Sequence, residues 1–225
     1  KASAADLAFF PSATKINPHF AREERVILTL QRARRRHHFI FLNEIGDKLQ
    51  ASIEFNQAIG NRNLIIRSLP KEVYTSKDLL QKTAAEINEV AAKLAPHKMR
   101  VGYHNHMTDF NKFGADFWWN LFADATKKNV ILQFDTGNAS EMEGVTVLDF
   151  LKRNKGRTIS MHVKPFSKTK PDAFLGEDEL NWNEIMKTVE TVGGLEWYII
   201  EYERDAYPPL EALKANLDRF KKMRA

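Results

Sequence analysis

The sequence contains no cysteine, and this absence limits the chemistry that the protein can perform. Disulfide bonds and thiolate catalysis are excluded, so any bound metal must be held by nitrogen and oxygen atoms. No apolar stretch approaches the roughly 20 residues that a membrane-spanning helix needs, so no membrane association is expected. The hydrophobic segment of a signal peptide is also missing, which favours the cytoplasm slightly, although a processed exported protein would lack it too.

Low-complexity linkers are absent as well, and the 225 residues with 43% hydrophobic content are enough for one substantial core. We therefore expect a single domain spanning residues 1–225, with an atypical N-terminal segment at residues 1–45. The formal net charge is +5, and a solvated helix face explains its basic clusters better than a nucleic-acid site. No nucleic-acid partner is expected. The clusters are Arg32, Arg34, Arg35 and Arg36, and Arg219, Lys221, Lys222 and Arg224.

Four short apolar runs in the second half of the chain each end in residues that can bind a metal. Such runs are typical of strands buried on both faces of a parallel sheet. In a parallel α/β barrel, ligands and catalytic groups lie at the C-terminal ends of the strands. The runs cover residues 100–106, 130–135, 158–164 and 197–201, and they end in His104 and His106, Asp135, His162 and Glu201, respectively.

The segments between these runs have helical patterns. His104, Asp135, His162 and Glu201 are separated by 31, 27 and 39 positions, so each interval can hold one crossover helix. Thr75-Ser-Lys-Asp78 resembles a capping box before a helix that ends near Pro96. Further helices are predicted over residues 113–125, 145–153 and 182–192, and a last helix begins after Pro208-Pro209 and runs to the C-terminus.

The N-terminal part fits a complete barrel poorly. If Tyr103 lies on the fifth strand, then residues 64–68 and 39–42 form the fourth and third strands. Only 38 residues then remain for two βα units, which normally need about 60. Residues 6–10 and 26–30 are candidate strands, and the second reads equally well as a helix. Missing strands would expose an edge that a partner chain could cover, so a homo-oligomer is one possible arrangement.

The strand ends resemble those of the sugar phosphate isomerase/epimerase superfamily. These are xylose-isomerase-like TIM barrels that include inosose dehydratase, ketose 3-epimerases and, more distantly, endonuclease IV. The resemblance runs from about Gly46 to the C-terminus and implies a TIM (β/α)8-type barrel with shortened or incomplete N-terminal βα units. It is carried by Gly-Tyr-His-Asn-His at 102–106, Phe-Asp-Thr-Gly-Asn at 134–138, Met-His-Val-Lys at 161–164, Leu-Gly-Glu at 175–177, Asn-Trp at 181–182 and Trp-Tyr-Ile-Ile-Glu at 197–201.

The same resemblance implies a divalent metal, Mn²⁺, Mg²⁺, Co²⁺ or Zn²⁺. Asp135, His162 and Glu201 fall on family ligand positions, and His104 stands where many members have a glutamate. Whether His104 or His106 is the fourth ligand stays open. The chain departs from the family pattern at Pro165, which replaces a common aspartate, and at Asp178, which replaces a frequent glycine.

Each candidate also has a simpler interpretation. An aspartate at a strand end often caps a helix, and Asp135 precedes Thr136-Gly-Asn138. A single buried histidine is commonly structural. An unpaired buried carboxylate is costly, so Glu201 is better explained by a cation beside it. Glu203 either supports the site or is a surface charge.

The resemblance implies an enzyme that isomerises, epimerises or dehydrates a small polyhydroxylated carbonyl compound, a sugar or sugar phosphate, through an enediolate-like intermediate. Glu201 would be the base, His106 or His104 would act on the opposite side, and Lys164 would bind a substrate oxygen or phosphate. A histidine in place of one glutamate breaks the symmetrical pair that suits epimerisation and favours dehydration or isomerisation. Alternatives are an inosose-dehydratase-like lyase, a non-catalytic degenerate barrel and, least favoured, an abasic-site endonuclease.

Overall fold

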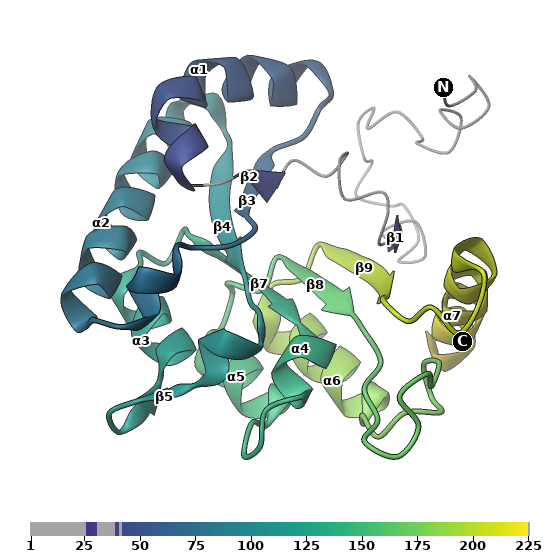
Figure 1. Cartoon of the computed structure of the whole chain (residues 1–225). Helices are drawn as coiled ribbons and strands as arrows, with labels where there is room; N and C mark the ends of the chain where they lie inside the picture. Colours follow the sequence, from purple (N-terminus) through teal and green to yellow (C-terminus); the bar gives the residue numbers. More distant parts are fainter. Residues whose placement is uncertain (1–25, 31–38, 41, 225) are drawn as a thin grey trace.

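The computed structural model describes residues 26–30, 39–40 and 42–224, and its centre is a parallel sheet of seven strands. The strand order is β1-β9-β8-β7-β4-β3-β2, and every neighbouring pair is parallel. The sheet curls, and the helices lie outside it (Figure 1). The strands are β1 (Val26–Leu30), β2 (Phe39–Ile40), β3 (Asn63–Ile66), β4 (Arg100–His104), β7 (Ile131–Asp135), β8 (Ser160–Val163) and β9 (Trp197–Tyr202).

The barrel is incomplete in the described part of the chain. β1 pairs with β9, so the first and last strands meet as they do in a closed barrel. β1 and β2 stand at the two ends of the strand order and are not paired with each other. The expectation of a TIM-type parallel α/β barrel with an incomplete N-terminal part is therefore confirmed. Residues 26–30 form a strand, whereas residues 6–10 and the basic cluster at 32–36 lie outside the described residues.

Helices follow most of the strands. They are α1 (Leu42–Ala58), α2 (Lys77–Leu94), α3 (Trp118–Ala125), α4 (Thr136–Ser140), α5 (Val147–Arg153), α6 (Trp182–Thr188) and α7 (Pro209–Arg224). Short 3-10 turns occupy Lys71–Tyr74, Ala95–His97 and Met107–Phe110, and a π-helical turn, Val189–Gly193, extends α6. Across the described residues, none of the helices has both the length and the apolar character needed to cross a membrane.

Three boundaries differ from the sequence prediction. Ser76, not Thr75, caps α2, because its hydroxyl accepts a hydrogen bond from the backbone N–H of Leu79. The segment predicted as helix from residue 113 first forms a hairpin of β5 (Lys112–Phe113) and β6 (Asp116–Phe117), which turns at Gly114 with φ +71°. Residues 39–42 were predicted as strand, but the strand ends at Ile40 and α1 begins at Leu42.

Alternating residues on the strands separate the core from the barrel interior. On β7, Leu132 and Phe134 join the hydrophobic core, in which Phe134 packs edge to face against Phe110. Gln133 and Asp135 belong to the opposite face, as the two-residue period of a strand requires. Both are buried, so this face carries polar groups into the barrel interior. The position of a residue along its strand thus decides whether its side chain joins the core or faces the barrel interior.

A buried arginine ties the opposite end of the barrel together. Arg157 is 2% exposed, and its guanidinium donates hydrogen bonds to the backbone carbonyls of Val130 (3.0 Å) and Ala123 (2.6 Å) and to the hydroxyl of Thr126 (2.7 Å). Burial lowers the pKa of Arg157 to about 10, so the side chain is still charged at neutral pH. These bonds join the C-terminus of α3 to the segments that precede β7 and β8.

We expect Arg157→Met to lower the free energy of unfolding by about 3 kcal/mol, because it leaves buried oxygens without their donor. Methionine fills most of the space of the arginine side chain, so the loss reports mainly the missing hydrogen bonds. Denaturant unfolding measures this change. Arg153→Met is the matched control, since Arg153 forms partly exposed ion pairs with Asp124 and Asp116, and its loss should cost less than about 1 kcal/mol. Equal losses in the two variants would show that Arg157 does not hold this end together.

Candidate metal centre

Four neighbouring strands bring the predicted metal ligands to the same end of the sheet. His104 is the last residue of β4 and Asp135 the last of β7, while His162 lies near the end of β8 and Glu201 near the end of β9. Asp135 is the register partner of His162 across β7 and β8. Parallel pairing of short strands therefore places these side chains together, and all four residues are at least nine-tenths buried.

His104, Asp135 and His162 form a compact group. One ligand atom from each lies within 4.8 Å of the others. Asp135 Oδ2 is 4.0 Å from His104 Nε2 and 3.9 Å from His162 Nδ1. Two atoms bound to the same ion at about 2.1 Å lie at most about 4.2 Å apart. Both distances from Asp135 Oδ2 are within this limit, so the spacing of this oxygen from each histidine nitrogen fits a shared ion.

Asp135 caps a helix with one carboxylate oxygen and leaves the other oxygen available to bind a cation. Its Oδ1 accepts a hydrogen bond from the backbone N–H of Asn138 at 2.8 Å and so caps α4. Its Oδ2 is buried and accepts no hydrogen bond within the described residues. Burial raises the pKa of Asp135 to about 7. A cation beside Oδ2 would supply the missing partner, so the donor set fits a divalent ion.

Glu201 lies beside this group and contacts His162. A Glu201 carboxylate oxygen accepts a hydrogen bond from His162 Nδ1, and the other oxygen is 3.9 Å from Lys164 Nζ. Burial by itself would raise the pKa of Glu201, but the charge and hydrogen bond of His162, together with Lys164, hold it well below its ordinary value. For His162, burial acts downward on the pKa, and Glu201 outweighs it and raises the pKa. Glu201 is therefore an ionised carboxylate at the edge of the cluster.

The two histidines of the 104–106 segment differ in position. β4 ends at His104, and His106 starts the turn that follows, with the ring centroids 5.0 Å apart. Burial lowers the pKa of both imidazoles, well below the ordinary value for His104. Both are therefore neutral at neutral pH, in the form that binds metals and accepts protons.

A buried network holds this turn in place. The backbone N–H of His106 donates to Asp109 at 2.5 Å, and the Tyr103 hydroxyl donates to the same carboxylate at 2.9 Å. The Tyr74 and Tyr103 hydroxyls are 2.6 Å apart. Asp109 is fully buried, and burial raises its pKa to about 7. His106 is thus attached to the core through its backbone, and its ring packs edge to face against that of His104.

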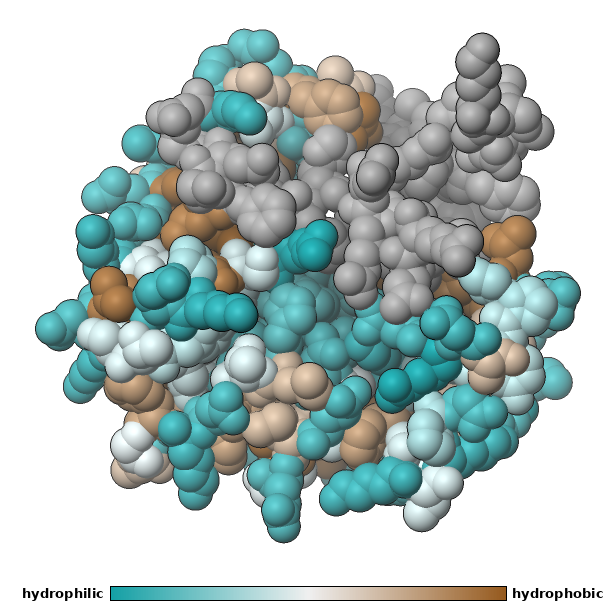
Figure 2. Space-filling view, viewed as in Figure 1, coloured by the Kyte–Doolittle hydropathy of each residue, from teal (hydrophilic) through white to brown (hydrophobic). Residues whose placement is uncertain are grey.

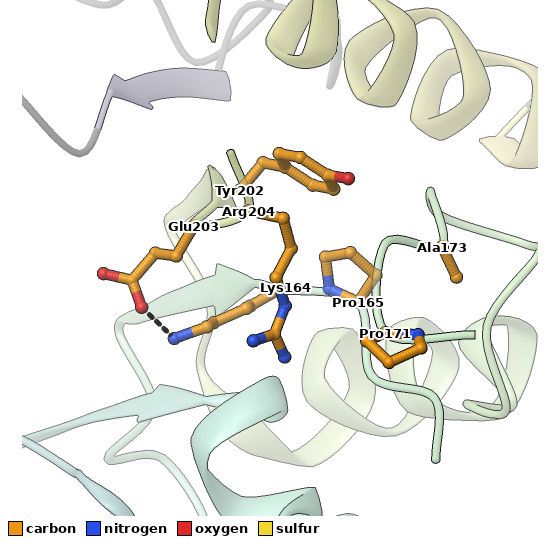
Figure 3. Close-up of a pocket in the computed structure, with 7 residues that line it drawn as sticks. All are labelled: Lys164, Pro165, Pro171, Ala173, Tyr202, Glu203 and Arg204. Carbon is orange, nitrogen blue, oxygen red and sulfur yellow. Dashed lines mark hydrogen bonds and ion pairs between the residues drawn. The ribbon is translucent and has the colours of Figure 1, made fainter. Parts of the chain in front are cut away.

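Lys164 reaches the site from the end of β8. Its Nζ donates to Asn138 Oδ1 at 2.9 Å and to Glu203 Oε2 at 2.5 Å (Figure 3). Its stem lies against Gly137, where an added Cβ would come within 2.6 Å of Lys164 Cγ. Burial would lower the pKa of Lys164, but Asp135, Glu201 and Glu203 together raise it, so the amine is charged. Glu203, left open by the sequence, belongs to the surroundings of the site.

Three supporting residues were missed by sequence reasoning. The side-chain amide of Asn105 accepts from the backbone N–H of Asp135 (2.7 Å) and donates to its carbonyl (3.2 Å). The Thr136 hydroxyl donates to the carbonyls of His162 and Lys164. Asn138 contacts Lys164, as described above. All three lie inside the His104–His106 and Phe134–Asn138 motifs, and this is the only sign of their importance in the sequence. Their hydrogen-bond partners could not be predicted, because those partners depend on strand register.

The mouth of the barrel is polar at the surface too. In the view of Figure 1, hydrophilic residues gather near the centre of the molecule, over the ends of β7, β8 and β9 (Figure 2).

Solved structures with the same fold carry several activities. A sugar phosphate isomerase/epimerase from Parabacteroides distasonis superposes with a TM-score of 0.69 at 19% identity, over 80% of this chain and 66% of that one. A probable 3-DHS dehydratase from Bacillus anthracis gives 0.61 at 15%, over 80% and 70%. An AP endonuclease, family 2, from Brucella melitensis gives 0.58 at 19%, over 87% and 77%. At these identities the comparisons establish a shared fold.

The chain spans slightly less than two thirds of the Parabacteroides protein. No curated protein matches the sequence. Residues 43–223 match the family described as the xylose isomerase-like TIM barrel. Because this match covers most of the chain and agrees with the curled parallel sheet, the protein belongs to the xylose isomerase-like TIM barrel family.

Proposed function

We propose that the protein is a divalent-metal-dependent enzyme that isomerises or epimerises a small polyhydroxylated carbonyl compound of the sugar or sugar phosphate class. The observation that carries this proposal is the buried Asp135 Oδ2, which faces two histidine nitrogens without accepting a hydrogen bond from the described residues. Family membership supports an enzyme of this kind, since isomerases and epimerases share the fold.

His104, Asp135 and His162 would hold the ion, with Glu201 as the fourth ligand. A bound divalent ion would polarise the substrate's carbonyl and stabilise negative charge that develops on its oxygen. Among the described residues there is one such group of three ligands, which favours a single-ion site over the multi-metal cluster that an abasic-site endonuclease would need.

Glu201 is suited to act as the base. Its carboxylate is kept ionised by His162 and Lys164, so it can accept a carbon-bound proton from a substrate held at the cluster. Lys164, charged and fixed by Asn138 and Glu203, can donate a hydrogen bond to a substrate oxygen. His106 lies on the other side, next to His104, and its neutral imidazole can accept or relay a proton there.

A dehydratase is the second candidate, and the observation that favours it is the asymmetry of these groups. One side of the site carries a carboxylate, Glu201, and the other carries imidazoles, His104 and His106. An epimerase works best with two similar groups that exchange roles, whereas β-elimination needs one base and one acid. The ring N–H of the neutral His106 imidazole could supply the proton that leaves with the hydroxyl group.

We expect one divalent ion per chain, with an affinity reduced by at least about 10²-fold in Asp135→Asn and in His162→Ala. Both changes remove a ligand from the group of three. Elemental analysis and calorimetric titration with Mn²⁺ and Zn²⁺ measure the effect. Asp116→Asn, in the hairpin before α3, is the matched control and should bind as the unmodified protein does. Unchanged metal affinity in both site variants would show that Asp135 and His162 do not bind the metal.

The two histidines should behave differently. Because His104 is inside the group of three and His106 is in the turn beyond it, His104→Ala should weaken metal binding and His106→Ala should mainly lower turnover. Titration and single-turnover kinetics separate the two effects. The reverse pattern would exchange the roles, and normal binding and turnover in both variants would exclude this strand end from the site.

We expect the metal-loaded protein to exchange a carbon-bound proton for deuterium in D₂O with one or more members of a panel of ketoses, ketose phosphates and keto-inositols. Glu201→Gln keeps the shape, loses the base and should slow the exchange by at least about 10²-fold. Nuclear magnetic resonance follows the exchange, and elemental analysis must first show that the variant retains the metal.

An unaffected exchange rate in metal-loaded Glu201→Gln would assign the base to another residue. Cleavage of abasic DNA, with no exchange on any panel member, would contradict the sugar-enzyme proposal altogether.

A further inference from the structure

A small pocket lies directly beside the candidate metal centre. It is formed between the end of β9 and the loop that follows β8, with the Lys164–Glu203 pair at one side and Pro171 and Ala173 at the other (Figure 3). Lys164 connects the two sites, because its Nζ is 3.9 Å from Glu201 Oε1 and also lines the pocket. A substrate with its carbonyl at the cluster would extend its chain into this space. The lining residues are Lys164, Pro165, Pro171, Ala173, Tyr202, Glu203 and Arg204.

The cations of the pocket are already balanced by carboxylates. The Lys164 ammonium contacts Glu203 Oε2 at 2.5 Å and lies 3.9 Å from Glu201 Oε1. The Arg204 guanidinium is 3.8 Å from Glu141 Oε1. With a divalent ion balancing Asp135 and Glu201, Lys164 would still be balanced by Glu203. Among the residues that the structure describes, the pocket therefore offers no excess positive charge to an anionic group.

The hydrogen-bonding groups suit a hydroxyl. Lys164 only donates and Glu203 only accepts, and a hydroxyl can satisfy both at once. A phosphate only accepts, and its charge of about −1.5 to −2 would lie against Glu203 and Glu201. Pro165 and Pro171 lack the backbone N–H groups that often bind phosphate.

The pocket is small and partly open to solvent. Its enclosed part has a volume of about 10 Å³, which is room for one water-sized group such as a hydroxyl. Among the described residues, charge and hydrogen bonding both favour a hydroxyl over a phosphate at this position.

On the basis of the proposed function, we infer that this pocket holds the hydroxylated, unphosphorylated end of the substrate, and that the Lys164–Glu203 pair recognises its hydroxyl. The substrate class is thereby a free polyhydroxylated carbonyl compound and not its phosphate ester. Pro165, which departs from the family pattern, forms part of the apolar wall beside the pair.

The test compares matched substrates on the metal-loaded protein. Deuterium exchange is measured with D-fructose and D-fructose 6-phosphate, and with D-ribulose and D-ribulose 5-phosphate. We expect kcat/KM for exchange to favour the free ketose by at least about tenfold within any pair that reacts. Glu203→Gln keeps the shape of the side chain and removes its charge, so the ratio of free ketose to phosphate ester should fall by about tenfold.

Glu196→Gln is the matched control. Glu196 also forms an ion pair, with Arg100 at 2.9 Å, but it precedes β9 at the opposite end of that strand. The same substitution there should leave the ratio unchanged. The comparison within the unmodified protein requires no variant, so it decides the inference even if Glu203→Gln folds poorly.

Three outcomes would overturn the inference. A preference for phosphate esters in the unmodified protein would contradict the inference while leaving the proposed function intact. Arg67, which follows β3, would then be the next candidate for binding the phosphate. A preference for free ketoses that Glu203→Gln leaves unchanged would remove the Lys164–Glu203 pair from recognition. Absence of exchange with every compound, in protein shown to hold metal, would reject the proposed function and this inference with it.

Discussion

The site depends on a single buried carboxylate that serves two structures at once. Asp135 ends β7, and one of its oxygens caps α4. The other oxygen faces His104 and His162, and all three residues are buried. The Asn105 side chain holds the Asp135 backbone, and the cap holds one carboxylate oxygen. The carboxylate therefore cannot turn away from the histidines without breaking the cap of α4. The fold thus holds a partly unsatisfied group where a cation would stabilise it.

The rest of the site is arranged around this residue by the parallel sheet. Strand pairing sets the separation of His104, Asp135 and His162, and the Thr136 hydroxyl joins the ends of β7 and β8. Lys164 is then held between Glu203 and the cluster. Ligands that come from rigid strands are positioned more accurately than ligands on loops. The positions of the candidate metal ligands are therefore a consequence of register, while the loop after β8 lines the pocket beside them.

The sequence predicted the strand ends because each strand is a local signal: an apolar run followed by a polar residue. His104, Asp135, His162 and Glu201 could therefore be identified one by one. The roles of Asn105 and Asn138 could not, since their partners lie on other strands and depend on register. Residues 113–117 were misassigned because aromatic residues suit both helix and hairpin, and the turn at Gly114 decided between them. The pairing of β1 with β9 is likewise a long-range contact.

The most direct test of this account is a crystal structure of the protein with Mn²⁺, with anomalous scattering used to locate the ion. The account predicts one anomalous peak within about 2.0–2.4 Å of Asp135 Oδ2 and of a nitrogen of both His104 and His162. Glu201 should then turn one carboxylate oxygen from His162 towards the ion. A peak elsewhere, or no peak near Asp135 at saturating Mn²⁺, would contradict the claim that this carboxylate organises a metal centre.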